Sequence, residues 1–278
     1  TLFDINDIVF GKIAGRIITG AYLFYFFINT CLDIREVGNF ITNYIMSMTP
    51  MIPIIFLFTA ACAYAVHKGL PAILRNGFLF GSLIIITIIV DCIFLMPEID
   101  FDRFTPLFTR PFGDYVQATL NTAVIPFDGL IALPVILPYF QKVKNHKKSV
   151  FWGIFIGAVA IMIVVIRDWA VLGNTSLYAA IPSFQAVRLV KVGKVFTRVE
   201  ILIAAILVII RFFRCSILYY CFAKGVEHLL GLQSYKPLSG VLAIIMVCAS
   251  NCLYCSLAEG GYFGTYIGAY YIIFFVFI

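Results

Sequence analysis

Long apolar runs dominate the pattern of hydrophobic and polar positions along this chain. A helix needs about 20 apolar residues to cross the roughly 30 Å hydrocarbon layer of a membrane. Runs that meet this length lie at about 13–32, 51–67, 78–96, 116–140, 150–172, 199–222, 238–257 and 262–278. Segments of this length, so close together, exclude a barrel of short alternating strands. The pattern therefore predicts an all-α, polytopic membrane helix bundle of eight helices, which forms a single domain over residues 1–278.

Composition supports this prediction. Of the 278 residues, 62% are hydrophobic and only 12% are charged. No soluble globular domain has that balance, because its surface needs many more charged side chains. We interpret the chain as an integral, multi-pass membrane protein.

Basic residues are distributed unevenly between the two sets of loops. One set carries ten basic residues and three acidic ones, which are Lys12, Arg16, Lys68, Arg75, Lys142, Lys144, Lys147, Lys148, Lys224 and Lys236 against Asp4, Asp7 and Glu227. An excess of Lys and Arg marks the cytoplasmic side of a membrane. We therefore expect a cytoplasmic N-terminus, and we attribute the net charge of +6 to topology rather than to binding of nucleic acid.

The fourth apolar run contains residues that disrupt a helix. Residues 123–138 read AVIPFDGLIALPVILP. Pro126 removes a backbone donor and clashes with the preceding turn, so the helix should open near Ile125–Gly129. Backbone groups freed at this depth need protein or water as partners, and Asp128 needs a partner or a proton. The pattern favours a lined cavity, in which the half-helix after the break presents its positive end to an anionic group. A structural kink with no ligand is the alternative.

The position of this broken helix suggests an inverted repeat. Many secondary transporters consist of two inverted repeats with broken helices at matching positions. Five predicted helices run from about 116 to the end of the chain, and only three precede them. We expect that the first repeat lacks its first two helices. This agrees with Thr1 in place of an initiator methionine and with the lack of a secretory signal in Thr1–Gly11, so we interpret the chain as a fragment or a processed form.

Further polar residues lie within the apolar runs and are candidates for a lined pathway. They are Asn29, Asp91, Arg167, Asp168, Arg211 and Arg214. Arg211 and Arg214 are three residues apart and share one helix face. Either they contact a ligand, or one of them forms a structural ion pair with Asp128 or Asp91.

A long external loop is predicted at about 173–198. Its basic residues recur every three or four positions with apolar residues between them, as in a helix that lies on a surface. Such a helix anchors to lipid headgroups or covers an outer vestibule as a lid, and the sequence leaves both interpretations open.

Motifs of catalysis and of cofactor binding do not occur. The chain contains no GxxxxGK[ST], HExxH or GxSxG pattern, so we predict neither an enzyme nor a cofactor. Cys248, Cys252 and Cys255 line one side of a helix, but no His or carboxylate accompanies them. Small packing residues are therefore the better interpretation, and no metal site is predicted.

A series of short motifs follows one order and spacing along the chain. These are Arg35-Glu36 before Thr49-Pro50, then Leu74-Arg75, then Pro126-Phe127 at the break, and then Arg198-x-Glu200 at the start of a long amphiphilic helix. The set resembles the spore germination permease family, the B subunits of nutrient germinant receptors in endospore-forming bacteria. Where many members have Pro-Phe-Gly-Glu, this chain has Pro-Phe-Asp-Gly, with acid and glycine exchanged.

The resemblance implies a fold, a function and partners. The family is similar to amino acid–polyamine–organocation transporters, with ten helices in the inverted-repeat fold of leucine transporters. It implies a multi-pass subunit of the cell membrane or spore inner membrane that works with A and C subunits in the lipid bilayer. It also implies that the subunit senses a small nutrient, an amino acid above all, and triggers germination.

We place the expected binding site at the broken helix, at the first predicted helix and at the sixth. The residues are Thr122, Ala123, Ile125, Pro126, Phe127, Asp128, Gly129, Tyr22, Phe26 and Asn29, with Asp91, Arg211 and Arg214 as pathway or ion-pair residues. Two alternatives stay open. One is a proton-coupled amino-acid transporter with Asp128 or Asp91 as the proton carrier, and the other is a structural partner subunit that binds no ligand.

Overall fold

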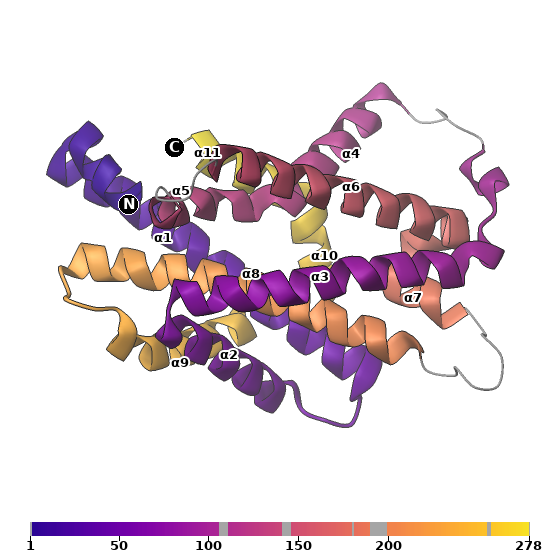
Figure 1. Ribbon diagram of the computed structural model, residues 1–278, viewed down its shortest axis with the longest axis horizontal. Helices are drawn as coiled ribbons and strands as arrows, with labels where there is room; N and C mark the ends of the chain where they lie inside the picture. Colours follow the sequence, from indigo (N-terminus) through magenta and orange to yellow (C-terminus); the bar gives the residue numbers. More distant parts are fainter. Residues whose placement is uncertain are drawn as a thin grey trace. The chain divides into compact units, whose positions relative to one another are not determined.

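The computed structural model describes residues 2–105, 111–140, 146–179, 181–189, 199–254 and 257–277, and all regular structure within these ranges is helical (Figure 1). The prediction of an all-α fold is therefore confirmed. The prediction of an inverted repeat stays a prediction.

The first helix is much longer than the apolar run at 13–32 suggested. Helix α1 covers Leu2–Phe40 and continues into a π-helical turn at Ile41–Ile45. A kink at Gly11 interrupts it, with φ 78° and ψ 167°, a conformation that an L side chain rarely adopts. Asp33 and Glu36 follow the end of the predicted run, but both lie inside α1. The prediction was wrong because two carboxylates end a hydropathy window but need not end a helix.

Two helices follow in close succession. Helix α2 covers Met51–Lys68, directly after Pro50, and α3 covers Leu70–Leu95. Between them Gly69 has φ 94°, and its N–H donates to the carbonyls of Ala65 and Val66. Only glycine adopts this conformation readily, so Gly69 ends α2 and separates it from α3.

The fourth run is broken where its prolines lie. Helix α4 covers Phe112–Val124, and a 3₁₀ helix at Ile125–Ala132 follows. The short helix α5 covers Leu133–Ile136, and a further 3₁₀ turn covers Leu137–Tyr139. Each proline removes one backbone donor, which favours the change of helix type. The expected half-helix after the break is thus only four residues long, too short for the strong helix dipole that we expected there.

The remaining elements continue the helical pattern. Helix α6 covers His146–Leu172, α7 covers Pro182–Leu189 and α8 covers Val199–Leu230. Helix α9 covers Ser239–Cys252, α10 covers Leu257–Tyr262 and α11 covers Ala269–Phe277, with a π-helical stretch at Phe263–Gly268 between the last two. Short 3₁₀ helices lie at Met96–Glu98, Phe101–Phe104, Gly173–Tyr178 and Lys236–Leu238.

Six helical segments of the described residues are long and apolar enough to cross a membrane. They are Leu2–Ile45, Met51–Lys68, Leu70–Glu98, Phe112–Tyr139, Lys147–Ser176 and Ile203–Leu230. They correspond to the first six predicted helices, while the seventh, Lys236–Cys252, is a shorter apolar helix. Many large apolar side chains on these helices are exposed, as expected for surfaces that face lipid. The chain is a helical, multi-pass membrane protein, and its orientation stays a prediction.

The chain divides into two compact units. Unit 1 contains Thr1–Arg75, Pro111–Gln141 and Arg211–Ile278. In this unit, α1, α2 and α9 pack against one another (Figure 1). Its core is built from aromatic and aliphatic side chains that are almost fully buried, among them Tyr25, Phe26, Ile34, Ile55, Tyr219, Tyr220 and Met246. The prediction of one domain over 1–278 stays a prediction.

Unit 2 contains Asn76–Arg110 and Lys142–Ile210. Its smaller core joins Leu95 of α3, Val171 and Leu172 of α6, Ala186 and Val187 of α7 and Ile203 of α8. Helix α7 belongs to the predicted external loop, and its apolar face is buried in this core. Residues 190–198, with Lys191, Lys194 and Arg198, lie outside the described residues, so the anchor and the lid both stay hypotheses.

Two glycines of α1 test how tightly the helices of unit 1 pack. A Cβ added at Gly38 would lie 2.5 Å from Cγ2 of Ile55 and 2.9 Å from Cγ of Met51, whereas one at Gly20 would meet no heavy atom within 4 Å. We expect Gly38→Ala to lower the free energy of unfolding by about 1–3 kcal/mol through overpacking. Gly20→Ala should be neutral or stabilise by up to about 1 kcal/mol. Thermal unfolding of the purified protein in detergent measures both, and equal effects would contradict the packing.

Candidate functional site

A buried carboxylate marks the broken helix. Asp128 lies within the 3₁₀ segment and is only 4% exposed. Its Oδ2 is 2.5 Å from Nη2 of Arg214 on α8. Its backbone carbonyl accepts a hydrogen bond of 3.1 Å from the hydroxyl of Tyr25 on α1. The break is therefore tied to two other helices, once through a charge and once through the backbone.

A second carboxylate extends this ion pair into a network. Asp33 of α1 is 1% exposed, and its Oδ1 lies 2.7 Å from Nη1 of Arg211 and 2.5 Å from Nη1 of Arg214. Nη2 of Arg211 also reaches Oε2 of Glu36 at 2.6 Å. We call these five residues the charged cluster: Asp33, Glu36, Asp128, Arg211 and Arg214. The cluster connects α1, α8 and the broken helix within unit 1.

The charged cluster carries an excess of negative charge. Three carboxylates face two guanidinium groups, so the formal sum is −1. Within the part of the chain that the structure describes, Oδ2 of Asp33 and Oδ1 of Asp128 are buried without a hydrogen-bond partner. Buried polar atoms without partners are costly. The arrangement can therefore accept a donor, such as an ammonium group, in addition to its own arginines.

Aromatic side chains surround the broken helix. The ring of Tyr25 stacks on that of Tyr271 at 5.5 Å between centroids and contacts Phe275 of α11 at 5.0 Å. Phe26 meets Tyr25 edge to face at 5.8 Å. These apolar surroundings keep the dielectric constant low, so the ion pairs of the cluster are stronger than they would be in water.

Arg35, next to the cluster in sequence, is engaged elsewhere. Its Nη1 donates to Oδ1 of Asn251 at 2.9 Å, and its Nη2 donates to the carbonyl of Tyr254 at 3.1 Å. Burial, with the nearby Glu36 carboxylate, raises the pKa of Tyr254 to about 12. The Tyr254 hydroxyl is therefore neutral at physiological pH, and it accepts a hydrogen bond of 3.0 Å from the Asn39 amide. Arg35 links α1 to the end of α9 and does not neutralise the cluster.

Most of the residues predicted for binding lie near the break, but few of their side chains reach the charged cluster. Three of these residues are buried, namely Phe26, Asn29 and Asp128. Three are half-buried, namely Tyr22, Phe127 and Gly129, and three are exposed, namely Thr122, Ile125 and Pro126. The side chain of Ala123 lies outside the described residues. Asn29 donates to the carbonyl of Tyr25 in its own helix, and Thr122 donates to that of Ala118. Asp128 is the predicted binding residue that forms an ion pair in the cluster.

The ion pair expected between one of the two arginines and Asp128 or Asp91 forms at Arg214. Arg214 forms the pair with Asp128, while Arg211 pairs with Asp33 and Glu36. Asp91 pairs with Arg167 of α6 in unit 2, at 3.7 Å. The partners of Arg211 were not expected, because α1 was predicted to end before Asp33.

Sequence reasoning missed Asp33 and Tyr25, although one signal was present for the former. Asp33 and Glu36 are three residues apart, as are Arg211 and Arg214. Two pairs of opposite charge with equal helical spacing present complementary faces. Tyr25 gave no such signal, since its partner is a backbone carbonyl that only the break makes available.

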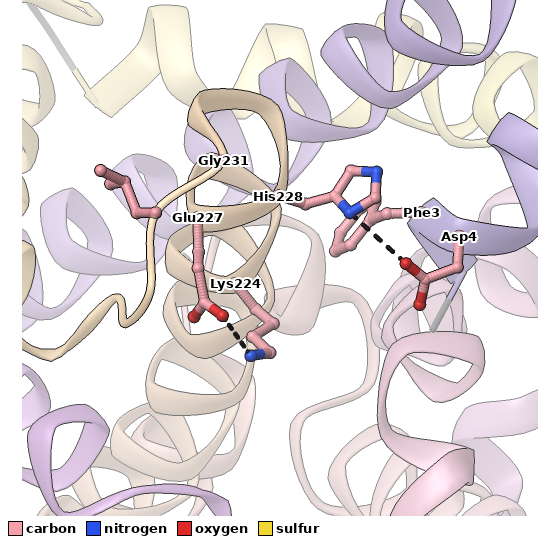
Figure 2. Close-up of a pocket in the computed structure, with 7 residues that line it drawn as sticks. Phe3, Asp4, Lys224, Glu227, His228 and Gly231 are labelled. Carbon is pink, nitrogen blue, oxygen red and sulfur yellow. Dashed lines mark hydrogen bonds and ion pairs between the residues drawn. The ribbon is translucent and has the colours of Figure 1, made fainter. Parts of the chain in front are cut away.

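A pocket of about 340 Å³ lies away from the break, at the C-terminal end of α8 (Figure 2). It is lined by Phe3, Asp4, Lys224, Glu227, His228, Gly231 and Leu232. Figure 2 shows its two ion pairs, Lys224 with Glu227 at 2.6 Å and His228 with Asp4 at 3.5 Å. His228 also reaches Asp7 at 3.0 Å. All four charged lining residues already have partners, so we regard the charged cluster as the better candidate site.

A metal ion has no evident place in the described part of the chain. No group of three or more His, Cys, Asp or Glu side chains there is arranged to hold one. The free cysteines described include Cys248 and Cys252, both exposed.

Comparison with known proteins gives a consistent set of matches. A family described as spore germination protein matches residues 1–254. The chain is 28% identical over 156 residues to spore germination protein B2 of Bacillus subtilis (strain 168), which covers 55% of this chain and 42% of that protein. It is 22% identical over 239 residues to spore germination protein KB of the same organism, over 83% of this chain and 64% of that protein.

A third relative, spore germination protein YndE of the same organism, is 22% identical over 265 residues, or 89% of this chain and 68% of that protein. The chain thus spans less than two thirds of the length of the first two relatives. No solved structure matches the chain.

Loss of a carboxylate should lower the free energy of unfolding much more at the centre of the charged cluster than at its edge. Asp33→Asn leaves two arginines without their shared buried partner, and we expect it to lower the free energy of unfolding by about 3 kcal/mol. Glu36 has a side chain that is 49% exposed, so Glu36→Gln should cost less than about 1 kcal/mol. Denaturation of the purified protein in detergent measures both, and similar costs would show that Asp33 does not hold the cluster together.

Proposed function

The chain belongs to the spore germination permease family, and on this premise we propose that it is the membrane subunit of a germinant receptor that senses a small nutrient. An amino acid is the ligand class that we propose, and the broken helix with its charged cluster is the proposed binding site. The receptor's A and C subunits and the spore inner membrane are the proposed partners and location, as the family resemblance implies. The names of the three relatives, all spore germination proteins, support the first part.

The ion pair of Arg214 with Asp128 is the observation that carries the proposal. It joins a guanidinium and a carboxylate at 2.5 Å, next to a helix break. An amino acid carries the complementary groups, an ammonium and a carboxylate on one carbon. The ammonium can take the place of Arg214 at Asp128, while the carboxylate binds the guanidinium of Arg214, which favours forked contacts with carboxylates.

Two carboxylate oxygens without hydrogen-bond partners favour the replacement of Arg214 by the ligand's ammonium group at Asp128. Oδ1 of Asp128 and Oδ2 of Asp33 accept no hydrogen bond from the described residues. An ammonium has three donors and satisfies such oxygens better than the side chains already there. The ligand thus gains hydrogen bonds that the ligand-free protein lacks.

Coupling to the rest of the receptor follows from the same contacts. A ligand shifts a conformational equilibrium only by its difference in affinity for the two states. Separation of Arg214 from Asp128 weakens the link between α8 and the broken helix, and leaves Arg214 attached to α1 through Asp33. The ligand therefore favours a state in which the broken helix can shift relative to α8, while the hydroxyl of Tyr25 still ties it to α1.

Two buried carboxylates, Asp128 and Asp91, favour a second candidate function, proton-coupled transport of the same ligand class. Uptake by proteoliposomes distinguishes the two. Accumulation driven by a pH gradient would favour the transporter, and saturable binding without flux would favour the sensor.

The test of the sensing site uses spores that lack their own receptors and carry the complete gene with its partner subunits. Asp128→Asn keeps the size of the side chain and removes its charge, so we expect the nutrient concentration for half-maximal dipicolinate release to rise about 10–100-fold, from the loss of a charged hydrogen bond. Arg214→Lys keeps the charge but loses the fork and should also impair the response.

Asp114→Asn is the matched control, because it makes the same substitution at an exposed carboxylate of α4 that lies outside the charged cluster. It should leave the nutrient response close to native. Subunit amounts are compared by immunoblot in every strain. An unchanged response across an amino-acid panel in Asp128→Asn, at native subunit levels, would refute the broken helix as the sensing site.

A further inference from the structure

One arginine in unit 2 is shared unequally by two buried carboxylates. Arg167 of α6 donates from Nε and Nη2 to Oδ1 of Asp168, at 3.0 and 2.6 Å. Its Nη1 lies 3.7 Å from Oδ2 of Asp91 on α3, a longer contact than a hydrogen bond. The hydroxyl of Ser183 on α7 donates to the other oxygen of Asp168. Asp168 thus has both oxygens occupied, while Asp91 is held weakly.

The charges of this group do not balance. Asp91, Arg167 and Asp168 are only 5–6% exposed, and two carboxylates face one guanidinium. Two neighbouring acids in a low-dielectric site do not both stay ionised when one cation serves them. Because Asp168 has the guanidinium and the hydroxyl, the uncompensated carboxylate is Asp91. Its Oδ1 is buried and has no hydrogen-bond partner within the described ranges.

Either a metal cation or a proton can restore the balance, and the surroundings favour a proton. A bound metal cation needs several oxygen ligands around it. No group of three or more metal-binding side chains occurs in the described part of the chain. The hydroxyl of Thr87, one helical turn before Asp91, donates to the carbonyl of Leu83 in its own helix. A proton needs no coordination shell.

We propose that Asp91 is a proton-binding site within the membrane, and that its protonation sets how Arg167 divides between the two aspartates. When Asp91 takes a proton from water, it becomes neutral and Arg167 belongs to Asp168 alone, the arrangement described here. When Asp91 releases the proton, its carboxylate draws Arg167 from Asp168. Asp168 then loses the guanidinium contacts that fix the position of its side chain, so its hydrogen bond from Ser183 is no longer held in place and the attachment of α7 to α6 weakens.

Among the described residues of unit 2, the other basic side chains near this group do not replace Arg167. On α7, Arg188 is exposed, and Ser183 is the residue that reaches Asp168. Arg103, in the 3₁₀ helix at Phe101–Phe104, pairs with Asp100 and donates to the carbonyl of Ala170. Proton exchange at Asp91 is therefore governed by α6, and it is transmitted to α7.

Infrared spectroscopy tests the site directly, because a protonated carboxyl absorbs apart from a carboxylate. We expect the native protein in lipid nanodiscs to show a protonated-carboxyl C=O band at neutral pH that shifts in deuterated water. Asp91→Asn should remove this band, and Asp100→Asn, which changes a half-exposed acid of the same unit, should retain it. Lack of the band in native protein, or a band of unchanged intensity in Asp91→Asn, would overturn the proposal. Asp128→Asn separates any contribution of the charged cluster.

Hydrogen exchange of the α7 amides tests the coupling. Asparagine resembles the protonated acid, so Asp91→Asn should keep α7 protected at every pH. In native protein, protection of residues 183–189, corrected for the intrinsic exchange rate, should fall as the pH rises and Asp91 ionises. Asp168→Ala should show low protection throughout, because it removes the oxygens that accept from Arg167 and from Ser183. The same pH dependence in native protein and in Asp91→Asn would contradict the coupling.

Discussion

A carboxylate buried in a membrane helix bundle needs a compensating charge, and Asp33 shows how far this requirement organises unit 1. One of its oxygens binds two arginines of α8. Since Arg214 also binds Asp128, the position of the broken helix depends on the same residue of α1. A hydrophobic side chain in place of Asp33 could fill its volume, but each of the two arginines would keep only its other carboxylate, Glu36 or Asp128, and removing one member of a buried ion pair is costly. The charges thus fix which helix faces meet.

The break in the fourth run depends on a similar requirement, that buried backbone groups have hydrogen-bond partners. Pro126 cannot donate a backbone hydrogen bond, and the 3₁₀ pattern that follows leaves carbonyls in changed positions. The hydroxyl of Tyr25 accounts for one of them by donating to the carbonyl of Asp128. In lipid, irregular backbone persists only where protein or water supplies such partners. The break therefore lies against α1, α8 and α11, and Asp128 is carried into the interior with it.

Local sequence signals predicted the helical fold and the position of the break, because long apolar runs and prolines determine the local backbone conformation without a distant partner. They failed where a residue's role depends on a distant partner. Asp33 and Glu36 lowered the hydropathy at the end of a run, and the helix was predicted to stop there, whereas α1 continues to Phe40. Asp128 and Arg214 were each recognised as costly at depth, but their pairing depends on the packing of α8 against the broken helix. The weak partner of Asp91 was likewise invisible, since it depends on how Arg167 is shared.

The sign of the charged cluster constrains which ligands it can accept. Its formal sum is −1, so an anion without a compensating cation meets net repulsion there. A zwitterion adds no net charge and can pair with Asp128 and Arg214 at once, whereas an uncharged molecule would separate the two without replacing their contacts. Sites of this kind discriminate strongly, because a ligand that lacks either group leaves a buried charge unpaired. If the proposed function holds, discrimination against uncharged nutrients follows from the ion pair itself, and we expect the choice among amino acids to depend on the aromatic side chains around the broken helix.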